Sequence, residues 1–172
     1  MVDTPLGAMR AAAEDEADIA PDRRSARLRG LWFIGQKYFP EDTETWTPAP
    51  NLPVFISLRA WLKEYFTRKI PETEVPLSPA GTDFQKAVWK LLLEIPFGAT
   101  TTYGAIAARL AKGNRGRPAA QAVGGAVGHN PISLIIPCHR VVGADGSLTG
   151  YAGGLEKKRA LLEMEREINV HC

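Results

Sequence analysis

The sequence lacks long hydrophobic runs. Among its 172 residues there is no stretch of eighteen consecutive apolar residues, so a transmembrane helix is not expected. The first twenty residues hold five acidic side chains and no apolar segment of the kind that a signal peptide needs. These absences favour a cytoplasmic protein without a membrane partner.

Cysteine is also scarce. Cys138 and Cys172 are the two cysteines of the chain, and two thiols make neither a disulfide scaffold nor a four-thiolate zinc site. We therefore expect no bound metal, no other cofactor and a reducing compartment. With 45% hydrophobic and 23% charged residues, the chain is typical of globular proteins, and its length allows one domain or two small ones.

Acidic residues are almost missing from the middle of the chain. Residues 84–140 contain one acid, Glu94, against seven basic residues, which are Lys86, Lys90, Arg109, Lys112, Arg115, Arg117 and Arg140. This local excess of positive charge indicates a polyanionic partner such as nucleic acid, although many basic faces are merely solvated.

A proline-rich stretch at residues 71–79 predicts a linker and a domain boundary near residue 78. The two domains would then be residues 1–78 and 79–172. In the first, β-forming residues predict a strand over 28–34, and apolar side chains at helical spacing predict a helix over 54–66.

The second half carries three helix signals. Thr82 and Gln85 have the spacing of a capping box, and Thr102 can cap a second helix. After a basic turn at 113–117, residues 119–128 predict a third helix, one face of which has almost no side chains: Gln121, Gly124, Gly125 and Gly128. Such a face either packs closely inside the protein or, in a helix-turn-helix, presses into a widened DNA minor groove.

A cysteine in an electropositive setting forms the chemical centre. Residues 132–136 predict a short buried strand that Pro137 ends, and Cys138, His139 and Arg140 follow directly. Neighbouring cationic or proton-accepting groups raise the thiolate fraction of a cysteine, and the thiolate is the nucleophile. The alternative is an inert buried cysteine, which is common.

Glu165 lies on the apolar face of the last predicted helix, with Leu161, Leu162 and Ile168. A buried carboxylate needs a partner. His139 would give a Cys–His–Glu relay, whereas Lys158 or Arg159 would give an ordinary ion pair at the protein edge.

Several short motifs together resemble the O6-alkylguanine-DNA alkyltransferases, in particular the bacterial Ogt type. In the second half they are 84–89 (FQKAVW), 95–103 (IPFGATTTY), 122–126 (AVGGA), 130–131 (NP), 136–142 (IPCHRVV) and 149–154 (TGYAGG). Residues 3–7 (DTPLG) and 30–40 (GLWFIGQKYFP) are similar too. The resemblance therefore covers nearly the whole chain.

The resemblance implies an α/β fold with an N-terminal ribonuclease-H-like sheet domain and a C-terminal winged helix-turn-helix alkyltransferase domain. It also implies direct-reversal DNA repair. The protein would flip an alkylated base of double-stranded DNA through the minor groove and transfer the alkyl group, once and irreversibly, from O6-alkylguanine or O4-alkylthymine to its own cysteine. We expect a monomer, and cooperative binding along DNA stays open.

The same resemblance assigns roles to residues. Cys138 is the acceptor, His139 the water-mediated base, Glu165 the carboxylate that orients it, and Asn130 the brace of this turn. Tyr103 helps to rotate the phosphate and to protonate the leaving guanine. The substrate pocket would be lined by Val141, Tyr151, Ala152 and Gly153. DNA contacts are expected from Tyr103, Arg115, Arg117, Gln121, Ala122, Gly124, Gly125 and Arg140.

Gln121 departs from the family pattern, which usually has an arginine there to fill the gap left by the flipped base. Glutamine is shorter and uncharged, so base flipping and not the chemistry is affected. Arg115 and Arg117 in the adjacent turn are the candidates to assist in its place. A second departure is the lack of an N-terminal cysteine cluster, so the structural zinc of some relatives is not expected.

Three other functions compete with alkyl transfer. They are a non-catalytic sensor of alkylated DNA, a winged-helix regulator and a cysteine hydrolase using Cys–His–Glu. Relatives that act only as sensors lack the cysteine, whereas Cys138 is present. A hydrolase would turn over repeatedly, so a single-turnover titration separates it from a suicidal transferase.

Overall fold

The computed structural model describes residues 1–14, 26–112, 116 and 118–169. The chain divides into two compact units, Met1–Pro79 and Ala80–Cys172, and the division falls in the proline-rich stretch at 71–79. Within the described ranges, every helix is too short or too polar to cross a membrane.

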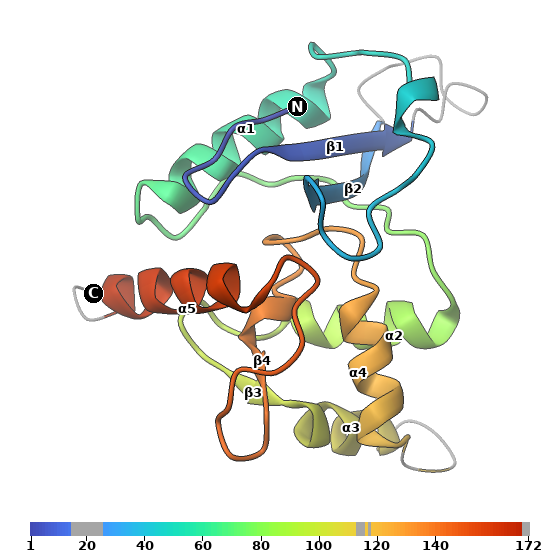
Figure 1. The fold of residues 1–172 in the computed structure, drawn as a ribbon, viewed down its shortest axis with the longest axis vertical. Helices are drawn as coiled ribbons and strands as arrows, with labels where there is room; N and C mark the ends of the chain where they lie inside the picture. Colours follow the sequence, from blue (N-terminus) through green and yellow to red (C-terminus); the bar gives the residue numbers. More distant parts are fainter. Residues whose placement is uncertain (15–25, 113–115, 117, 170–172) are drawn as a thin grey trace. The chain divides into compact units, whose positions relative to one another are not determined.

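The first unit is a small antiparallel sheet covered by one helix (Figure 1). Strands β1 (Met9–Glu14) and β2 (Arg27–Phe33) pair with a register shift between Ala12 and Ala13. Helix α1 (Pro53–Phe66) buries one face, formed by Val54, Leu58, Leu62 and Tyr65. A short 3-10 turn, η2 (Thr43–Thr45), precedes it. The strand and the helix expected from the sequence are confirmed within one residue at each end.

The second unit begins with three packed helices, α2 (Asp83–Leu93), α3 (Tyr103–Ala111) and α4 (Ala120–Gly128) (Figure 1). The capping box is confirmed, because the Thr82 side chain accepts from the Gln85 amide and the Gln85 side chain accepts from the Thr82 amide. Buried Val123, Ala126 and Val127 turn one side of α4 to the core, as the spacing predicts.

An indole ties two of these helices together. Trp89 of α2 is buried and donates from Nε1 to the carbonyl of Ala126 in α4 at 2.8 Å. A Cβ atom on Gly81 would lie 2.5 Å from the same ring, so Trp89 packs here against a position that only glycine fits. This contact holds the buried side of α4 against α2.

Two very short parallel strands place the functional segments side by side. Strand β3 (Thr101–Thr102) pairs with β4 (Val141–Val142), in the register Thr101 with Val141 and Thr102 with Val142. Tyr103 follows β3 directly, and the 3-10 turn η3 (Cys138–Arg140) directly precedes β4. The start of α3 is thereby brought to the segment that carries Cys138. Helix α5 (Leu155–Asn169) ends the described part of this unit.

The prediction of a strand over residues 132–136 is wrong. These residues form a compact buried turn in which Leu134 has a left-handed φ of 70°. The amide of Ile135 donates to Ser133, and that of Ile136 donates to Ile132. Apolar content predicts burial but does not distinguish a strand from a turn whose polar backbone groups are satisfied locally.

Candidate active site

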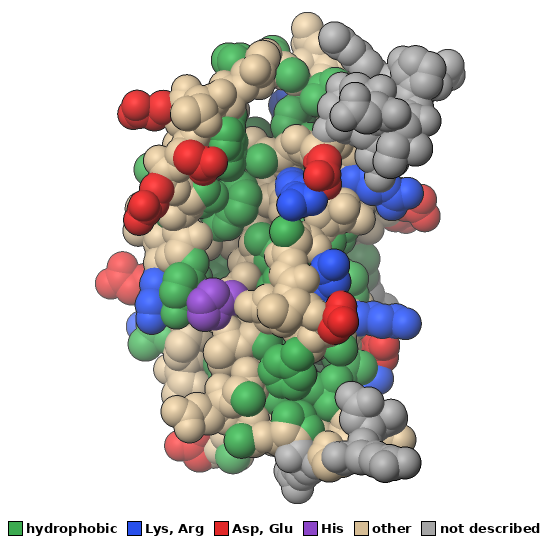
Figure 2. Space-filling model, turned by 90° about the vertical axis from the view of Figure 1, so that its right-hand side faces the viewer, with side chains coloured by type: hydrophobic (Ala, Val, Ile, Leu, Met, Phe, Trp, Pro, Cys, Tyr) green, Lys and Arg blue, Asp and Glu red, His purple; other side chains and the backbone are tan. Residues whose placement is uncertain are grey.

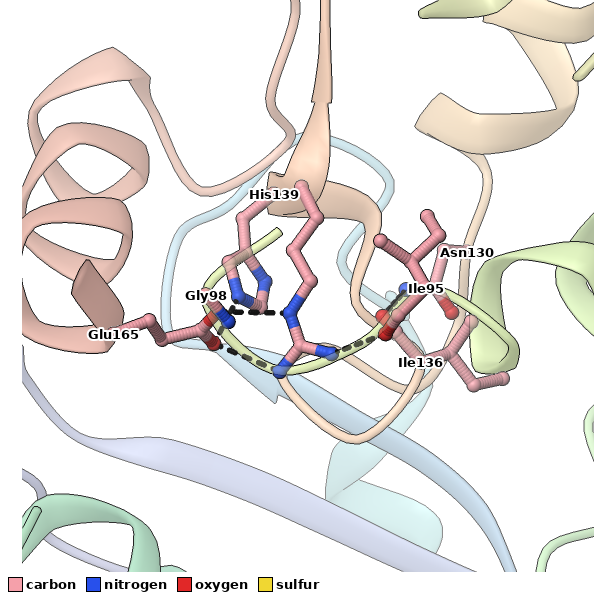
Figure 3. Close-up of polar contacts among 7 residues, drawn as sticks. Ile95, Gly98, Asn130, Ile136, His139 and Glu165 are labelled. Carbon is pink, nitrogen blue, oxygen red and sulfur yellow. Dashed lines mark hydrogen bonds and ion pairs between the residues drawn. The ribbon is translucent and has the colours of Figure 1, made fainter. Parts of the chain in front are cut away.

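Asn130 organises the turn that leads to Cys138. Its Oδ1 accepts from the Ile132 amide at 3.0 Å, and its Nδ2 lies within hydrogen-bond distance of the carbonyls of Ile132 and Ile136 and of Cys138 Sγ, at 3.2, 2.8 and 3.1 Å. An amide nitrogen has two hydrogens, so these three acceptors share them. The predicted role of Asn130 as a brace therefore has a clear geometric basis (Figure 3).

Cys138 is 5% exposed and opens η3. Burial raises the pKa of its thiol, while the hydrogen bond from Asn130 and the charge of Lys158 act in the opposite direction. The resting sulfur is thus a protonated thiol that is shielded from solvent. A transfer reaction at this sulfur needs a base to remove its proton.

His139 and Glu165 form the buried pair that the sequence predicts. Nε2 of His139 lies 2.8 Å from Oε1 of Glu165, and both side chains are fully buried (Figure 3). Burial lowers the pKa of His139, although Glu165 acts to raise it. The imidazole is therefore neutral at pH 7 and able to accept a proton.

The resemblance places Arg140 among the DNA contacts, and such a contact requires an exposed side chain. The Arg140 side chain is buried instead. It is 8% exposed, and Nε and Nη2 of its guanidinium donate to the two oxygens of Glu165 at 2.8 and 2.9 Å. Its Nη1 donates to the carbonyl of Ile95 at 2.8 Å. The physical reason is that Glu165 is a buried charge, which draws in the nearest cation.

Glu165 is held as a carboxylate. Besides His139 and Arg140, it accepts from the backbone amide of Gly98 at 3.1 Å. Burial acts to raise its pKa, but the hydrogen bonds from His139 and Arg140, together with the charge of Arg140, outweigh burial and lower the pKa to about 2. Glu165 therefore orients its neighbours and does not itself carry protons at neutral pH.

Lys158 is a second fully buried charge of α5. Its Nζ donates to the carbonyls of Val141, Thr149 and Gly150, at 2.5, 2.6 and 3.3 Å. Burial lowers its pKa to about 8, against an opposing effect of Cys138. Lys158 is thus not the edge partner of Glu165 that the sequence left open. It precedes Glu165 by seven positions, the spacing that places both on one helix face.

The tyrosines of the site flank this lysine and the relay. The Tyr103 hydroxyl donates to the Thr149 carbonyl at 3.2 Å, the oxygen that Lys158 also contacts. Burial, and to a smaller extent Cys138, raise the pKa of Tyr103. The Tyr151 ring meets the His139 imidazole edge-on at 6.5 Å, and Ala152 and Gly153 continue from Tyr151 into a partly exposed turn.

The face of α4 that has few side chains is exposed to solvent. Gln121, Ala122 and Gly125 are exposed, and a Cβ on Gly125 would meet nothing within 4 Å. A Cβ on Gly124 would lie 3.8 Å from the Tyr103 ring, which places that ring beside α4. Arg115 and Arg117 fall outside the described residues.

The basic residues of 84–140 are not all available to a partner. Arg140 is buried, and Arg109 forms an ion pair with Glu94. On the face drawn in Figure 2, basic side chains are interspersed with acidic and hydrophobic ones. Among the described residues, no group of three or more His, Cys, Asp or Glu side chains is placed to hold a metal ion.

The chain is similar to proteins of known family. The family model described as "6-O-methylguanine DNA methyltransferase, DNA binding domain" matches residues 83–167. A methylated-DNA–protein-cysteine methyltransferase of Mycobacterium bovis is 45% identical over 166 residues, 96% of this chain and 90% of that protein. One from Haemophilus influenzae is 45% identical over 135 residues, 78% of this chain and 72% of that protein.

The chain is also similar to solved structures. The crystal structure of Mycobacterium tuberculosis OGT in complex with DNA superposes with a TM-score of 0.80 at 41% identity, covering 97% of this chain and 91% of that one. The M. tuberculosis O6-methylguanine methyltransferase gives a TM-score of 0.71 at 43% identity, covering 93% and 94%. The two-domain α/β alkyltransferase fold expected from the sequence is thus confirmed.

Proposed function

Because the chain belongs to the methylated-DNA–protein-cysteine methyltransferase family, and so repairs DNA by alkyl transfer, we propose that Cys138 accepts the alkyl group of O6-alkylguanine in double-stranded DNA, once and irreversibly. The observation that carries this proposal is a buried thiol that accepts a hydrogen bond from Asn130 and is followed in the chain by His139, whose imidazole is paired with Glu165 and has a lowered pKa. A neutral base beside a protonated nucleophile is the resting state that such a reaction requires.

The proposed step uses three side chains and one water molecule. A water molecule carries the thiol proton of Cys138 to Nδ1 of His139, because Nε2 lies against Glu165. The sulfur attacks the alkyl carbon, the new S–C bond forms, and the C–O6 bond breaks with its electrons going to guanine. Tyr103 supplies the proton that neutralises the departing base, and its phenolate then regains a proton from solvent while the His139 imidazolium releases the proton it took. The resulting thioether has no easy route back to a thiolate, so each molecule acts once.

Access to the base follows from the exposed face of α4. We place Gln121, Ala122, Gly124 and Gly125 against the minor groove, where a helix without bulky side chains fits a groove about 6 Å wide once it is widened. The alkylated base rotates out past Tyr103 into a pocket lined by Val141, Tyr151, Ala152 and Gly153. Unstacking costs a few kcal/mol, which pocket contacts offset. O4-alkylthymine is a second substrate, and the protein acts as a monomer.

The first test is intact-mass analysis after incubation with duplex DNA containing O6-methylguanine. We expect one added methylene per protein, mapped to Cys138, and a stoichiometric end point. Cys138→Ala should lose transfer completely and keep its affinity for DNA, because the sulfur performs the chemistry and the helices perform the binding. Transfer by Cys138→Ala would show that the acceptor is another residue, and repeated turnover by the unaltered protein would indicate a hydrolase.

A further inference from the structure

Arg140 carries a buried positive charge that the proposed transfer step does not use. Its guanidinium meets Glu165 side-on through Nε and Nη2, and the third nitrogen reaches the carbonyl of Ile95. Fork-shaped pairs of this kind fix the direction of a carboxylate as well as its charge. Burying such a pair has a substantial desolvation cost, which suggests that it contributes something other than stability.

The carboxylate of Glu165 is fully engaged. Oε1 contacts His139 Nε2 and Arg140 Nη2, while Oε2 accepts from Arg140 Nε and the Gly98 amide (Figure 3). Four contacts match the approximately four lone-pair sites that a carboxylate offers. Because all of these contacts suit an anion, the proton between His139 and Glu165 stays on the imidazole.

We propose that Arg140 is a positioning residue for alkyl transfer, which holds Glu165 so that His139 keeps its proton on Nε2 and receives the thiol proton on Nδ1. This inference rests on the proposed function. It replaces the DNA contact that the sequence suggested for Arg140. It also gives the relay a third charged member in addition to His139 and Glu165.

Charges around His139 explain what Arg140 changes. Glu165 of α5 favours the imidazolium form, whereas Arg140 of η3 and Lys158 of α5 oppose it. Cys138 precedes the imidazole in η3, and the neutral Tyr151 ring lies edge-on to it. Arg140 therefore offsets part of the negative charge of Glu165, so that His139 is held in place by a carboxylate and still stays neutral as a base.

Arg140 also connects the relay to the turn between α2 and β3. The guanidinium binds the Ile95 carbonyl and lies over the Phe97 ring at 5.1 Å, and Glu165 binds the Gly98 amide. This turn leads into Thr101, Thr102 and Tyr103. One buried cation is thus bound both to the carboxylate that holds His139 and to the turn that leads to Tyr103, the residue proposed to protonate the leaving base.

The test compares Arg140→Met and Arg140→Lys with Arg159→Met, which removes the same kind of charge from an exposed position of α5. The transfer rate to free O6-benzylguanine is measured from pH 5 to 9, because this substrate needs no DNA contact. The pKa of His139 is followed by NMR, and duplex affinity is measured against salt. Thermal unfolding checks that each variant is folded.

We expect Arg140→Met to slow transfer to the free base at least tenfold at pH 7 and to move the midpoint of the pH profile, and the His139 titration, upward. Arg140→Lys keeps the charge without the fork, so its rate should be intermediate and its midpoint close to the parent. Arg159→Met should transfer at the parental rate. The salt dependence of duplex binding should be the same for all four proteins.

Several results would overturn the proposal. One is a parental rate and pH profile in Arg140→Met, and another is a slower rate with an unmoved midpoint, which would mean a structural role only. A weaker salt dependence of duplex binding in either Arg140 variant would mean that Arg140 contacts DNA, as the resemblance implied. If Arg140→Met does not fold, the transfer rate of Arg140→Lys provides the test. A parental rate in Arg140→Lys would show that the two-nitrogen contact of the guanidinium with Glu165 is not needed for transfer. Absence of a mass change at Cys138 in the unaltered protein would instead reject the proposed function.

Discussion

Cys138 is a buried thiol with a raised pKa, so its reactivity depends on its neighbours. Asn130 donates to the sulfur, and this hydrogen bond strengthens when the sulfur becomes an anion. His139 is neutral and next in the chain. Single residues of the site therefore matter through the protonation state that they favour. Gln121 matters instead through its size and its lack of charge.

Gln121 is the residue whose replacement we expect to improve function. Gln121→Arg should tighten binding to lesion-containing duplex and speed transfer, because a planar cation fills the gap left by the flipped base and contacts phosphates. Single-stranded DNA and free O6-benzylguanine need no such plug, so their rates should change much less. The measurement is the single-turnover rate of both proteins on the three substrates.

Two outcomes would contradict this view of Gln121. Equal changes on all three substrates would mean that residue 121 acts through the fold or the pocket. No gain on duplex would mean that another side chain already fills the gap, and Arg115 and Arg117 of the adjacent turn are the first to test.

At the scale of elements, α4 combines a buried side with an exposed side that has few side chains. Val123, Ala126 and Val127 are buried, and Trp89 bonds to the Ala126 carbonyl. On the other side, Gly125 and Gly128 face open space. Glycine in a helix interior costs about 1 kcal/mol relative to alanine. Among the described residues, none packs so closely on position 125 that it requires glycine there, which favours an external surface as the reason.

Gly125→Ala tests this reason directly. The added methyl group meets nothing within 4 Å, so the free energy of unfolding should rise by up to about 1 kcal/mol. Affinity for duplex DNA should fall several-fold, because the methyl group projects from the face that we propose to enter the groove. Chemical denaturation and DNA titration of the same sample separate the two effects. A variant that is more stable and binds DNA with unchanged affinity would show that this face of α4 does not meet DNA.

At the scale of the whole molecule, the number of accessible basic side chains limits how many DNA phosphates the protein can contact. Of the seven basic residues in 84–140, Arg140 is buried against Glu165, which leaves at most six for phosphate contacts. The exposed face of α4 offers small residues and one glutamine, which do not suit base-specific readout in the major groove.

We therefore expect affinity for undamaged duplex to fall steeply with salt and to depend little on sequence. Each phosphate contact contributes about −0.9 to the slope of log K against log salt, so six contacts give a slope no steeper than about −5. Titrations of several duplex sequences between low and moderate salt measure it. A flat salt response or a strong preference for one sequence would be inconsistent with this mode of binding.

Stability of the molecule against acid should depend on Glu165. Its pKa is about 2 when folded and near 4.5 when unfolded, so the unfolded chain takes up the proton first as pH falls. The stabilisation from this ionised, buried carboxylate is fully present above pH 4.5 and is lost as pH falls toward 2. It amounts to roughly 3 kcal/mol.

Glu165→Gln removes this dependence. The variant should be less stable at pH 7, and its free energy of unfolding should change less between pH 5 and 2 than that of the parent. Urea unfolding at a series of pH values provides the comparison. Parallel pH curves for the two proteins would show that Glu165 does not carry the acid sensitivity.

The sequence alone determined those features whose signal lies within a few residues along the chain. The capping box at Thr82, the helix over 54–66 and the buried face of the third helix depend on spacing that the chain itself sets. The apolar spacing of α5 also predicted that Glu165 points inward, and His139 is its partner. Adjacent Cys138 and His139, with the surrounding motifs, indicated the chemistry.

Tertiary structure decided the partners of the remaining charges. Arg140 and Lys158 look like ordinary basic residues in the sequence, but one is buried against Glu165 and Ile95, and the other against three backbone carbonyls. The turn at 132–136 is held by the Asn130 amide and by its own backbone hydrogen bonds, which its apolar composition does not predict. Apolar periodicity reports which side of an element is buried, whereas the partner of a buried charge depends on contacts between residues far apart in the chain, and only the folded structure brings these together.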